Sequence, residues 1–395
     1  MMPIHHLETI KRLAERIGHP VRLMEVCGTH TMTAFRSGLR SLLPPNVELL
    51  SGPGCPVCVT PDDFVDRAIA IARRPDVIIA TFGDLLRVPG TESSLERERA
   101  RGADIRVVYS ALDALALAQK QPDRKIVFLG VGFETTAPTV AWVIRKAARL
   151  RQGFGGQAHL RQGFPLRDAA AAGQVGGQAR LRQGSGGQAR GMANFMVLTA
   201  HRTMPPAMAA LLQGGEVAID GFLCPGHVSA IIGTRPYEFI SRDYSLPCVV
   251  AGFEADDMLA AIAMLLKQVA EKRAQVEIQY TRGVSADGNL EALKIMAEVF
   301  EPCDAEWRGL GTIPASGLDI REAYRAHDAQ AVFTPQPCPK PVHRPACLCG
   351  DVLRGAKLPT DCTLFRTACT PETPVGACMV SSEGTCAAYY RYGKV

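Results

Sequence analysis

The sequence lacks the features that direct a protein into or across a membrane. Residues 1–18 are charged and helix-like, with no apolar secretory core. The longest clean apolar run, residues 258–266, is far shorter than the ~20 apolar residues that a membrane-spanning helix needs. We therefore expect a cytoplasmic protein without a membrane segment.

The sequence also lacks net charge outside one segment. Six arginines and one aspartate within residues 151–190 account for the whole formal charge of +5. The rest of the chain is neutral and offers no basic face, so we expect no nucleic-acid partner. This segment repeats LRQG and GGQA and has few large apolar residues. We expect 150–190 to be a disordered insertion rich in arginine, glycine and glutamine.

Cysteine, in contrast, is abundant, and its distribution is uneven. The chain has 13 cysteines, an odd number, and seven of them lie between residues 338 and 386. An odd number in a long chain without an export signal argues against a disulfide scaffold. Metal binding or catalytic thiol chemistry is the better explanation.

Short apolar strands alternate with amphipathic helices through most of the chain, which indicates an α/β fold with parallel sheets. A faint repeat, CGTHTM at 27–32 and TAHRTM at 199–204, indicates two related α/β domains that face each other across a cleft. After about residue 270 the pattern gives way to loops rich in proline and cysteine. The expected domains are a first α/β domain at 1–118, a second at 119–255 and a Cys-rich third at 256–395, with its cysteine-organised loops at 333–386. The extreme N-terminal helix could pack on the third domain.

Cys27 follows an expected strand and precedes an amphipathic helix. A thiol at a helix N-terminus has a lowered pKa, so we expect Cys27 to be a nucleophile or metal ligand. His30, three residues later, could act as a base or a ligand. The alternative is a small buried cysteine, which the polar motif CGTHT disfavours.

Cys55 and Cys58 form a CxxC pair at an expected helix start. The spacing suits a redox couple, in which one thiol is activated and the other resolves it. It also suits half of a zinc or iron–sulfur site, or two small core residues. A structural zinc site would need a second matching pair, and none is present.

The motif GFETTAPT begins like a dinucleotide-binding loop, but Thr135 stands where the third glycine belongs. The P-loop pattern is absent as well. Glu134, Thr135 and Thr136 would place one carboxylate and two hydroxyls at a helix start, where a helix cap explains part of the pattern. We treat all three as candidate site residues.

Four C-terminal cysteines have spacings that suit zinc or a [4Fe–4S] cluster. They are Cys347, Cys362, Cys369 and Cys386, with Cys338, Cys349 and Cys378 interspersed. Spacing in irregular loops does not decide between the two.

Four motifs in this order resemble the HypD family of [NiFe]-hydrogenase maturation proteins. They are EVCGTHT, GPGCPVCVT, GFETTAPT and the closing stretch from Cys369 to Val395. The resemblance covers nearly the whole chain apart from about 150–190.

The resemblance implies a scaffold that carries, together with the small partner HypC, the iron of the Fe(CN)2CO group, while HypE supplies cyanide. It implies three domains and a [4Fe–4S] cluster in the C-terminal region. Cys27 corresponds to the iron-handling cysteine, and Cys55 and Cys58 to the redox pair. The implied cluster ligands are Cys347, Cys362, Cys369 and Cys386.

We therefore expect Cys27, as thiolate, to hold iron in the cleft, with His30 and Glu134 orienting ligands or moving protons. The cluster would exchange electrons with the Cys55–Cys58 couple, facing Cys27 across that cleft. The chain is expected to be monomeric before it joins its partners. Two alternatives remain: a cluster-dependent oxidoreductase acting on protein disulfides, and a zinc-stabilised binding module.

Overall fold

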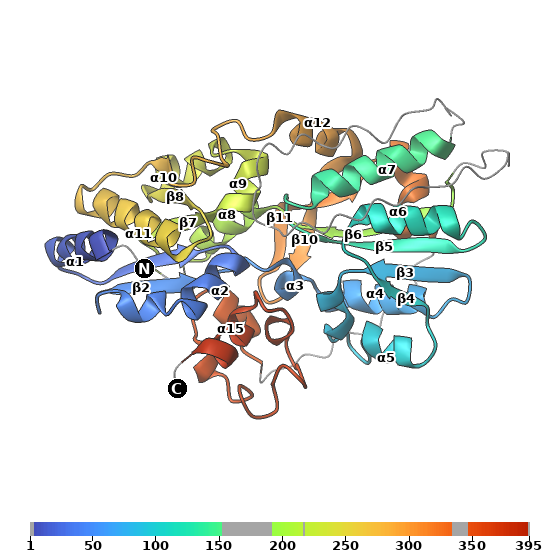
Figure 1. Cartoon of the computed structure of the whole chain (residues 1–395), viewed down its shortest axis with the longest axis horizontal. Helices are drawn as coiled ribbons and strands as arrows, with labels where there is room; N and C mark the ends of the chain where they lie inside the picture. Colours follow the sequence, from blue (N-terminus) through green and yellow to red (C-terminus); the bar gives the residue numbers. More distant parts are fainter. Residues whose placement is uncertain (1–3, 152–191, 216–217, 334–346, 394–395) are drawn as a thin grey trace.

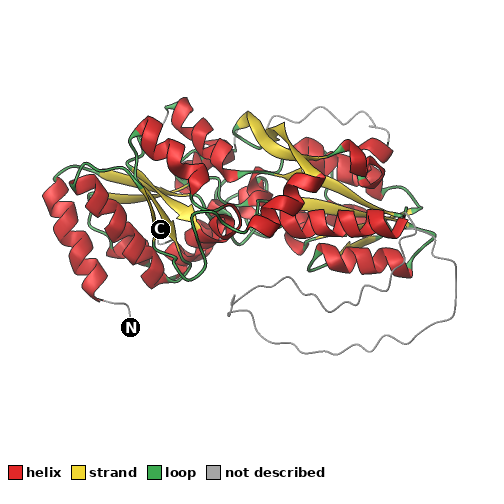
Figure 2. Ribbon diagram, turned by 90° about the horizontal axis from the view of Figure 1, so that it is seen from above, coloured by secondary structure: helices red, strands yellow, loops and turns green. Residues whose placement is uncertain are grey.

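The computed structural model describes residues 4–151, 192–215, 218–333 and 347–393. Almost all of the expected insertion at 150–190, and Cys338, lie outside these residues. Figure 1 shows two α/β halves along the long axis of the molecule, and Figure 2 shows helices on both sides of the strands in each half. The expected α/β class with parallel sheets is confirmed.

One sheet has five parallel strands in the order β2-β1-β7-β8-β9. They are β1 (Val21–Glu25), β2 (Val47–Ser51), β7 (Gly221–Pro225), β8 (Cys248–Ala251) and β9 (Val276–Ile278). Helices α1 (Ile4–Ile17) and α11 (Ala255–Ala270) pack against one face, where Leu23 and Leu223 are fully buried. Helices α8 (Met204–Gly214), α9 (Gly226–Ile232) and α10 (Glu238–Tyr244) cover the other face.

The second sheet has four parallel strands in the order β4-β3-β5-β6. They are β3 (Val77–Thr81), β4 (Ile105–Val107), β5 (Lys125–Gly132) and β6 (Phe195–His201). Helices α6 (Ala111–Lys120) and α7 (Ala137–Arg151) cover one face, and α4 (Asp62–Ala72) and α5 (Leu95–Ala100) cover the other. The inner strands β3, β5 and β6 are therefore apolar on both sides, whereas the edge strand β4 carries Arg106.

An antiparallel hairpin joins the two halves (Figure 1). It consists of β10 (Phe300–Trp307) and β11 (Gly311–Ile320), and α12 (Leu290–Val299) precedes it. Its base packs in the core of the four-stranded sheet through Phe300 and Leu318, whereas Trp307 near its turn lies in the core of the five-stranded half. The hairpin therefore spans the junction between the halves.

The Cys-rich C-terminal segment, residues 347–393, lies below the five-stranded half and the junction in Figure 1. Its ring contact between Tyr389 and Phe35, with centroids 4.4 Å apart, holds it against α2. Ala377 and Val380 pack into the core of the four-stranded half. The remaining helices are α2 (Gly28–Arg36), α3 (Pro56–Val59), α13 (Ala329–Val332), α14 (Cys349–Leu353) and α15 (Thr385–Tyr392). The 3-10 helices are Leu39–Leu42, Gly83–Arg87, Arg235–Tyr237, Glu322–His327, Pro359–Asp361 and Ala377–Met379.

Strand pairing divides the chain differently from the boundaries expected at residues 118 and 255. The chain builds β1 and β2 of one sheet, crosses to build β3 to β6 of the other, and returns for β7 to β9. Most of these strands are predominantly apolar, because both sheets are covered on both faces. The pattern therefore does not reveal which sheet a strand joins.

Within the described ranges, no helix is long and apolar enough to cross a membrane.

Candidate functional site

The backbone around Cys27 touches the loop that carries Cys55. Strands β1 and β2 are parallel neighbours, so the segments after them leave the same edge of the sheet. The Gly28 N–H donates to the Gly54 carbonyl at 2.9 Å. A Cβ at Gly54 would lie 2.2 Å from the Cys27 nitrogen, so only glycine fits there. Cys27 and the CxxC loop are thus in direct contact. The expectation that they face each other across a cleft is wrong.

The Cys27 thiol is buried at the N-terminus of α2, with 8% of the residue exposed. Burial raises its pKa to about 12, against the lowering that we expected from the helix. The backbone N–H groups of His30 and Thr29 do favour the thiolate, but the nearby carboxylates of Glu383 and Glu25 oppose it. The expectation of a lowered pKa is therefore wrong, because desolvation outweighs the helix terminus.

Glu25, the last residue of β1, is a buried partner of Cys27 that the sequence analysis missed. Its carboxylate accepts from the Cys27 N–H at 3.3 Å and from the Thr31 hydroxyl at 2.5 Å. The Arg40 guanidinium lies 3.9 Å away. Burial raises the pKa of Glu25 to about 7. The sequence did offer one sign of such a site, because Glu25 is an acidic residue at the end of a strand that is otherwise mostly apolar.

Glu383 brings the C-terminal segment onto the same site. Its carboxylate accepts from the Thr29 hydroxyl at 2.7 Å, and a Cβ at Gly28 would lie 2.6 Å from the Glu383 Cβ. Burial raises the pKa of Glu383. Sequence reasoning missed this residue too, because 354 positions separate it from Thr29.

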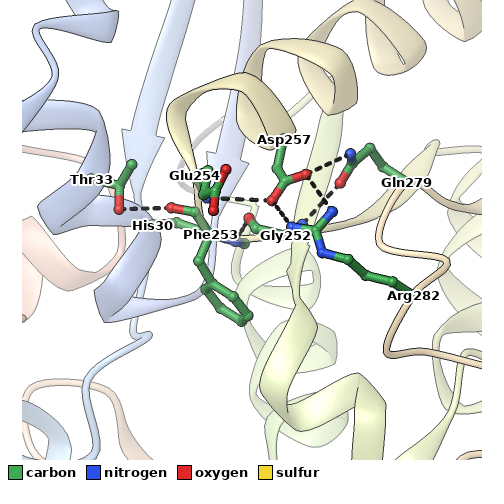
Figure 3. A network of polar contacts seen from close by, with 8 residues as sticks. All are labelled: His30, Thr33, Gly252, Phe253, Glu254, Asp257, Gln279 and Arg282. Atoms are coloured by element: carbon green, nitrogen blue, oxygen red, sulfur yellow. Dashed lines mark hydrogen bonds and ion pairs between the residues drawn. The ribbon is translucent and has the colours of Figure 1, made fainter. Parts of the chain in front are cut away.

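His30 is fully buried on α2 and reaches Gly252 in the loop after β8 (Figure 3). Its Nε2 lies 2.8 Å from the Gly252 carbonyl, which can only accept, so Nε2 carries the proton. Burial lowers the pKa of His30 to about 4, so the ring is neutral. Nδ1 is buried and has no hydrogen-bond partner among the described residues.

A polar network behind His30 fixes the loop after β8 (Figure 3). The Gly252 N–H donates to Gln279 at 3.0 Å, and the Gln279 amide donates to Asp257 at 3.0 Å. Arg282 pairs with the same Asp257 carboxylate at 2.5 Å. The Thr33 hydroxyl donates to the Phe253 carbonyl at 3.0 Å, which ties α2 to this loop. The network therefore sets the position of the Gly252 carbonyl that orients His30.

Cys55 and Cys58 lie at the start of the short helix α3, as expected, and both are buried. The Cys58 thiol lies 3.9 Å from the carbonyl of Ala377, the residue before Cys378. Burial raises the pKa of Cys58, and the neighbouring Cys378 side chain acts in the opposite direction. Cys378 in turn lies 2.7 Å from Cys349, sulfur to sulfur. Cys349 and Cys378 were noticed in the sequence but given no role. The structure places them between the CxxC pair and the remaining C-terminal cysteines.

One pocket gathers the cysteines of the C-terminal segment. Its thiols are Cys347, Cys349, Cys362, Cys369, Cys378 and Cys386, and its apolar lining includes Leu348, Val352, Leu364, Phe365 and Met379. The Val375 N–H donates to the Cys369 sulfur at 3.4 Å. Within the parts of the chain that the structure describes, no three or more His, Cys, Asp or Glu side chains gather closely enough to hold a single metal ion.

Glu134 lies in the loop between β5 and α7 and bonds to the junction of β6 and α8. One carboxylate oxygen accepts from the Met204 N–H at 2.9 Å, whereas the other is buried without a hydrogen-bond partner in the described structure. Burial raises the pKa of Glu134 to about 7. Thr136 bonds to the Phe133 carbonyl at 3.3 Å and Thr135 is exposed, so these two hydroxyls shape the turn.

The chain matches the family model described as HypD, hydrogenase formation hypA family, over residues 4–153 and 185–393. The gap in this match falls inside the segment that we expected to be an insertion. The chain is also similar to curated proteins named hydrogenase maturation factor HypD. It is 46% identical to the Rhodobacter capsulatus protein over 395 residues, which cover 98% of this chain and 94% of that protein. It is 43% identical to the Escherichia coli protein over 403 residues, which cover 99% and 96%.

Gly54→Ala tests the contact between Cys27 and the CxxC loop. The added Cβ meets backbone, so the loop must move and expose Cys27. We expect Cys27 to react with iodoacetamide about tenfold faster or more, since each ~1.4 kcal/mol lost by the closed state multiplies the open population about tenfold. Mass spectrometry of the Cys27 peptide measures the rate. Gly214→Ala, which adds a Cβ in open space, is the control and should leave the rate unchanged. Equal rates in both variants would contradict the contact.

Glu134→Gln tests the cost of burying that carboxyl group. The folded pKa of about 7 lies above the unfolded value of 4.5, so the contribution of Glu134 to stability is fully present below pH 4.5 and is lost as the pH rises through 7. Glutamine does not ionise and keeps an acceptor for Met204. The variant should therefore gain stability relative to wild type across this range, by up to about 3 kcal/mol in urea unfolding.

Glu98→Gln is the control of opposite sign. A hydrogen bond from Arg73 lowers the pKa of Glu98 to about 2, so this carboxylate stabilises the fold above pH 4.5, and the contribution is lost toward pH 2. The glutamine variant should lose stability relative to wild type as the pH rises. A pH-independent difference for Glu134→Gln would show that its carboxyl group is not perturbed.

Proposed function

This chain belongs to the HypD hydrogenase formation family, and on that premise we propose that it is a maturation factor that assembles the Fe(CN)2CO group of [NiFe] hydrogenase. It would bind iron with a HypC-type chaperone and receive cyanide from a HypE-type donor. The observation that supports this most directly is the meeting of three segments: the Cys27 loop, the CxxC loop and the Cys-rich C-terminal segment.

Cys27 is the proposed ligand for the iron that the protein carries as cargo. A thiolate is a soft ligand that suits low-valent iron. Because burial keeps the free thiol protonated, iron binding must release this proton. His30, held by Gly252, would orient groups around the metal, and Glu134, with its pKa of about 7, would hold or release a proton near neutrality.

We propose that the C-terminal pocket holds a [4Fe–4S] cluster. The donors would be Cys347, Cys362, Cys369 and Cys386. The pocket fits this group: soft thiols from separate turns line an apolar space, and a backbone N–H donates to Cys369. When bound, the cluster would supply one-electron transfer to the neighbouring thiols.

Cys349 and Cys378 lie between the pocket and the CxxC pair, and they allow a thiol–disulfide exchange that needs no oxidant or reductant from outside the chain. The Cys58 thiolate attacks the Cys378 sulfur of a Cys349–Cys378 disulfide, and Cys349 leaves as thiolate. Cys55 then attacks Cys58 and releases Cys378. Two electrons pass from the CxxC pair to Cys349 and Cys378, and the two protons lost by the first pair are taken up by the second. The reverse exchange uses the same contacts.

The oxidoreductase alternative requires the CxxC pair to reach disulfides of other proteins. Cys55 is 3% exposed and Cys58 is fully buried, which favours exchange inside the chain. Rapid multiple-turnover reduction of a protein disulfide without the HypC-type partner would favour this alternative instead.

Cys27→Ala tests the iron site. Produced together with the HypC-type partner, the variant should lose the CN and CO stretching bands in the infrared spectrum, because the alanine side chain cannot bind iron. Cys303→Ala, which removes a half-buried thiol on β10, is the control and should keep both bands. Bands of wild-type intensity in the Cys27 variant would refute the assignment.

Cys369→Ala tests the cluster site. The anaerobically purified wild type should contain about four iron atoms per chain beyond any cargo and give an iron–sulfur EPR signal on reduction. The variant should lose this signal because one ligand is gone, while Cys303→Ala keeps it. Zinc in place of iron in the wild type would support the zinc-stabilised module.

A further inference from the structure

The turn of the β10–β11 hairpin, residues 307–311, contacts three of the segments that carry the proposed chemistry. Figure 1 shows the hairpin between the two halves, near α3 and the C-terminal segment. Nothing in the sequence analysis gave this turn a role. Its three contacts come from three successive residues, Trp307, Arg308 and Gly309.

Arg308 holds the end of the CxxC helix. Its backbone N–H donates to the Val59 carbonyl at 2.9 Å, and its Nε donates to the Thr60 carbonyl at 2.7 Å. Its guanidinium also pairs with Asp62 at 2.7 Å. The Arg308 side chain is only 11% exposed and that of Asp62 20%, so the pair is shielded from water. One residue thus fixes the chain immediately after Cys58 at three points.

Gly309 holds the helix that begins at Cys349. Its φ of +76° favours glycine, and a Cβ at this position would lie 2.4 Å from the Gly350 Cα. The Arg354 guanidinium donates to the Gly309 carbonyl at 2.8 Å. The turn therefore touches the backbone next to Cys349 through Gly309, and the preceding residue, Arg308, touches the CxxC helix.

Trp307 anchors the turn from inside. It is fully buried, its indole N–H donates to the Ser316 hydroxyl at 2.8 Å, and its ring stacks on Phe133 with centroids 5.9 Å apart. Phe133 directly precedes Glu134. The turn is consequently a rigid support, and Arg308 is its one link to the CxxC helix that uses a charged side chain.

We propose that Arg308 is a positioning residue for thiol–disulfide exchange between the Cys55–Cys58 pair and the Cys349–Cys378 pair. The inference rests on the proposed function. It adds that the 307–311 turn holds the two cysteine pairs in a fixed position relative to each other. Arg308 fixes the Cys58 side and Gly309 fixes the Cys349 side through adjacent residues. The attacking sulfur of Cys58 therefore stays aligned with Cys378.

The test measures exchange in the intact chain. Wild type and Arg308→Ala are fully oxidised and then given limiting dithiothreitol anaerobically. The redox state of each pair is followed by acid quenching, differential alkylation and peptide mass spectrometry. We expect the two pairs to equilibrate in both proteins, but at least about tenfold more slowly in the variant, since a displacement of ~1 Å can cost about 100-fold in rate. Arg308→Lys, which retains the charge opposite Asp62 but not the planar fork, should be intermediate.

Controls separate positioning from folding. Arg235→Ala removes an exposed arginine–aspartate pair, 65% and 60% exposed, and should exchange at the wild-type rate. Thermal unfolding and circular dichroism identify any global loss of structure, and Arg308→Lys keeps the test valid if Arg308→Ala unfolds.

The possible outcomes are distinguishable. If wild type exchanges and both Arg308 variants match it, the role of Arg308 is refuted while the proposed function stands. If wild type itself shows no exchange between the pairs, the thiol relay and this role are both wrong. If the variants slow only in proportion to their loss of folded protein, Arg308 is merely structural.

Discussion

The backbone contact between Cys27 and Gly54 is the constraint on which the centre depends. Parallel neighbours β1 and β2 release their following loops at the same edge, so the CxxC loop must pass directly over Cys27. Only a residue without a Cβ leaves room for that passage. Gly28 likewise leaves room for Glu383 of the C-terminal segment, because a Cβ at Gly28 would collide with the Glu383 side chain. Two close approaches therefore bring three distant segments into one centre.

Closeness and burial have an electrostatic consequence. Where water is excluded, charged forms are disfavoured, so the pKa values of Cys27 and Glu25 in this centre are raised, and so is that of Glu134 between β5 and α7. The Cys27 thiol is thereby kept protonated, and the carboxyl groups of Glu25 and Glu134 titrate near neutrality. Such burial is unfavourable to stability, and groups of this kind cluster at functional sites.

Much of this centre was visible in the amino-acid sequence. The α/β class, Cys27 after a strand, the CxxC pair at a helix start and the group of C-terminal cysteines all follow from local patterns. The raised pKa of Cys27 does not follow from local patterns, because it depends on the distant segments that cover the thiol. The division of strands between the sheets was also missed, since strands buried on both faces look alike wherever they pair.

The sequence by itself determined which chemical groups this protein has and on which local elements they lie, because helix starts, strand ends and residue spacing are short-range properties. The tertiary structure alone decided which of them meet: Thr29 with Glu383, Cys58 with Cys378, and the 307–311 turn with both thiol pairs. Contacts between residues hundreds of positions apart arise only when the two halves and the C-terminal segment bury their apolar faces together.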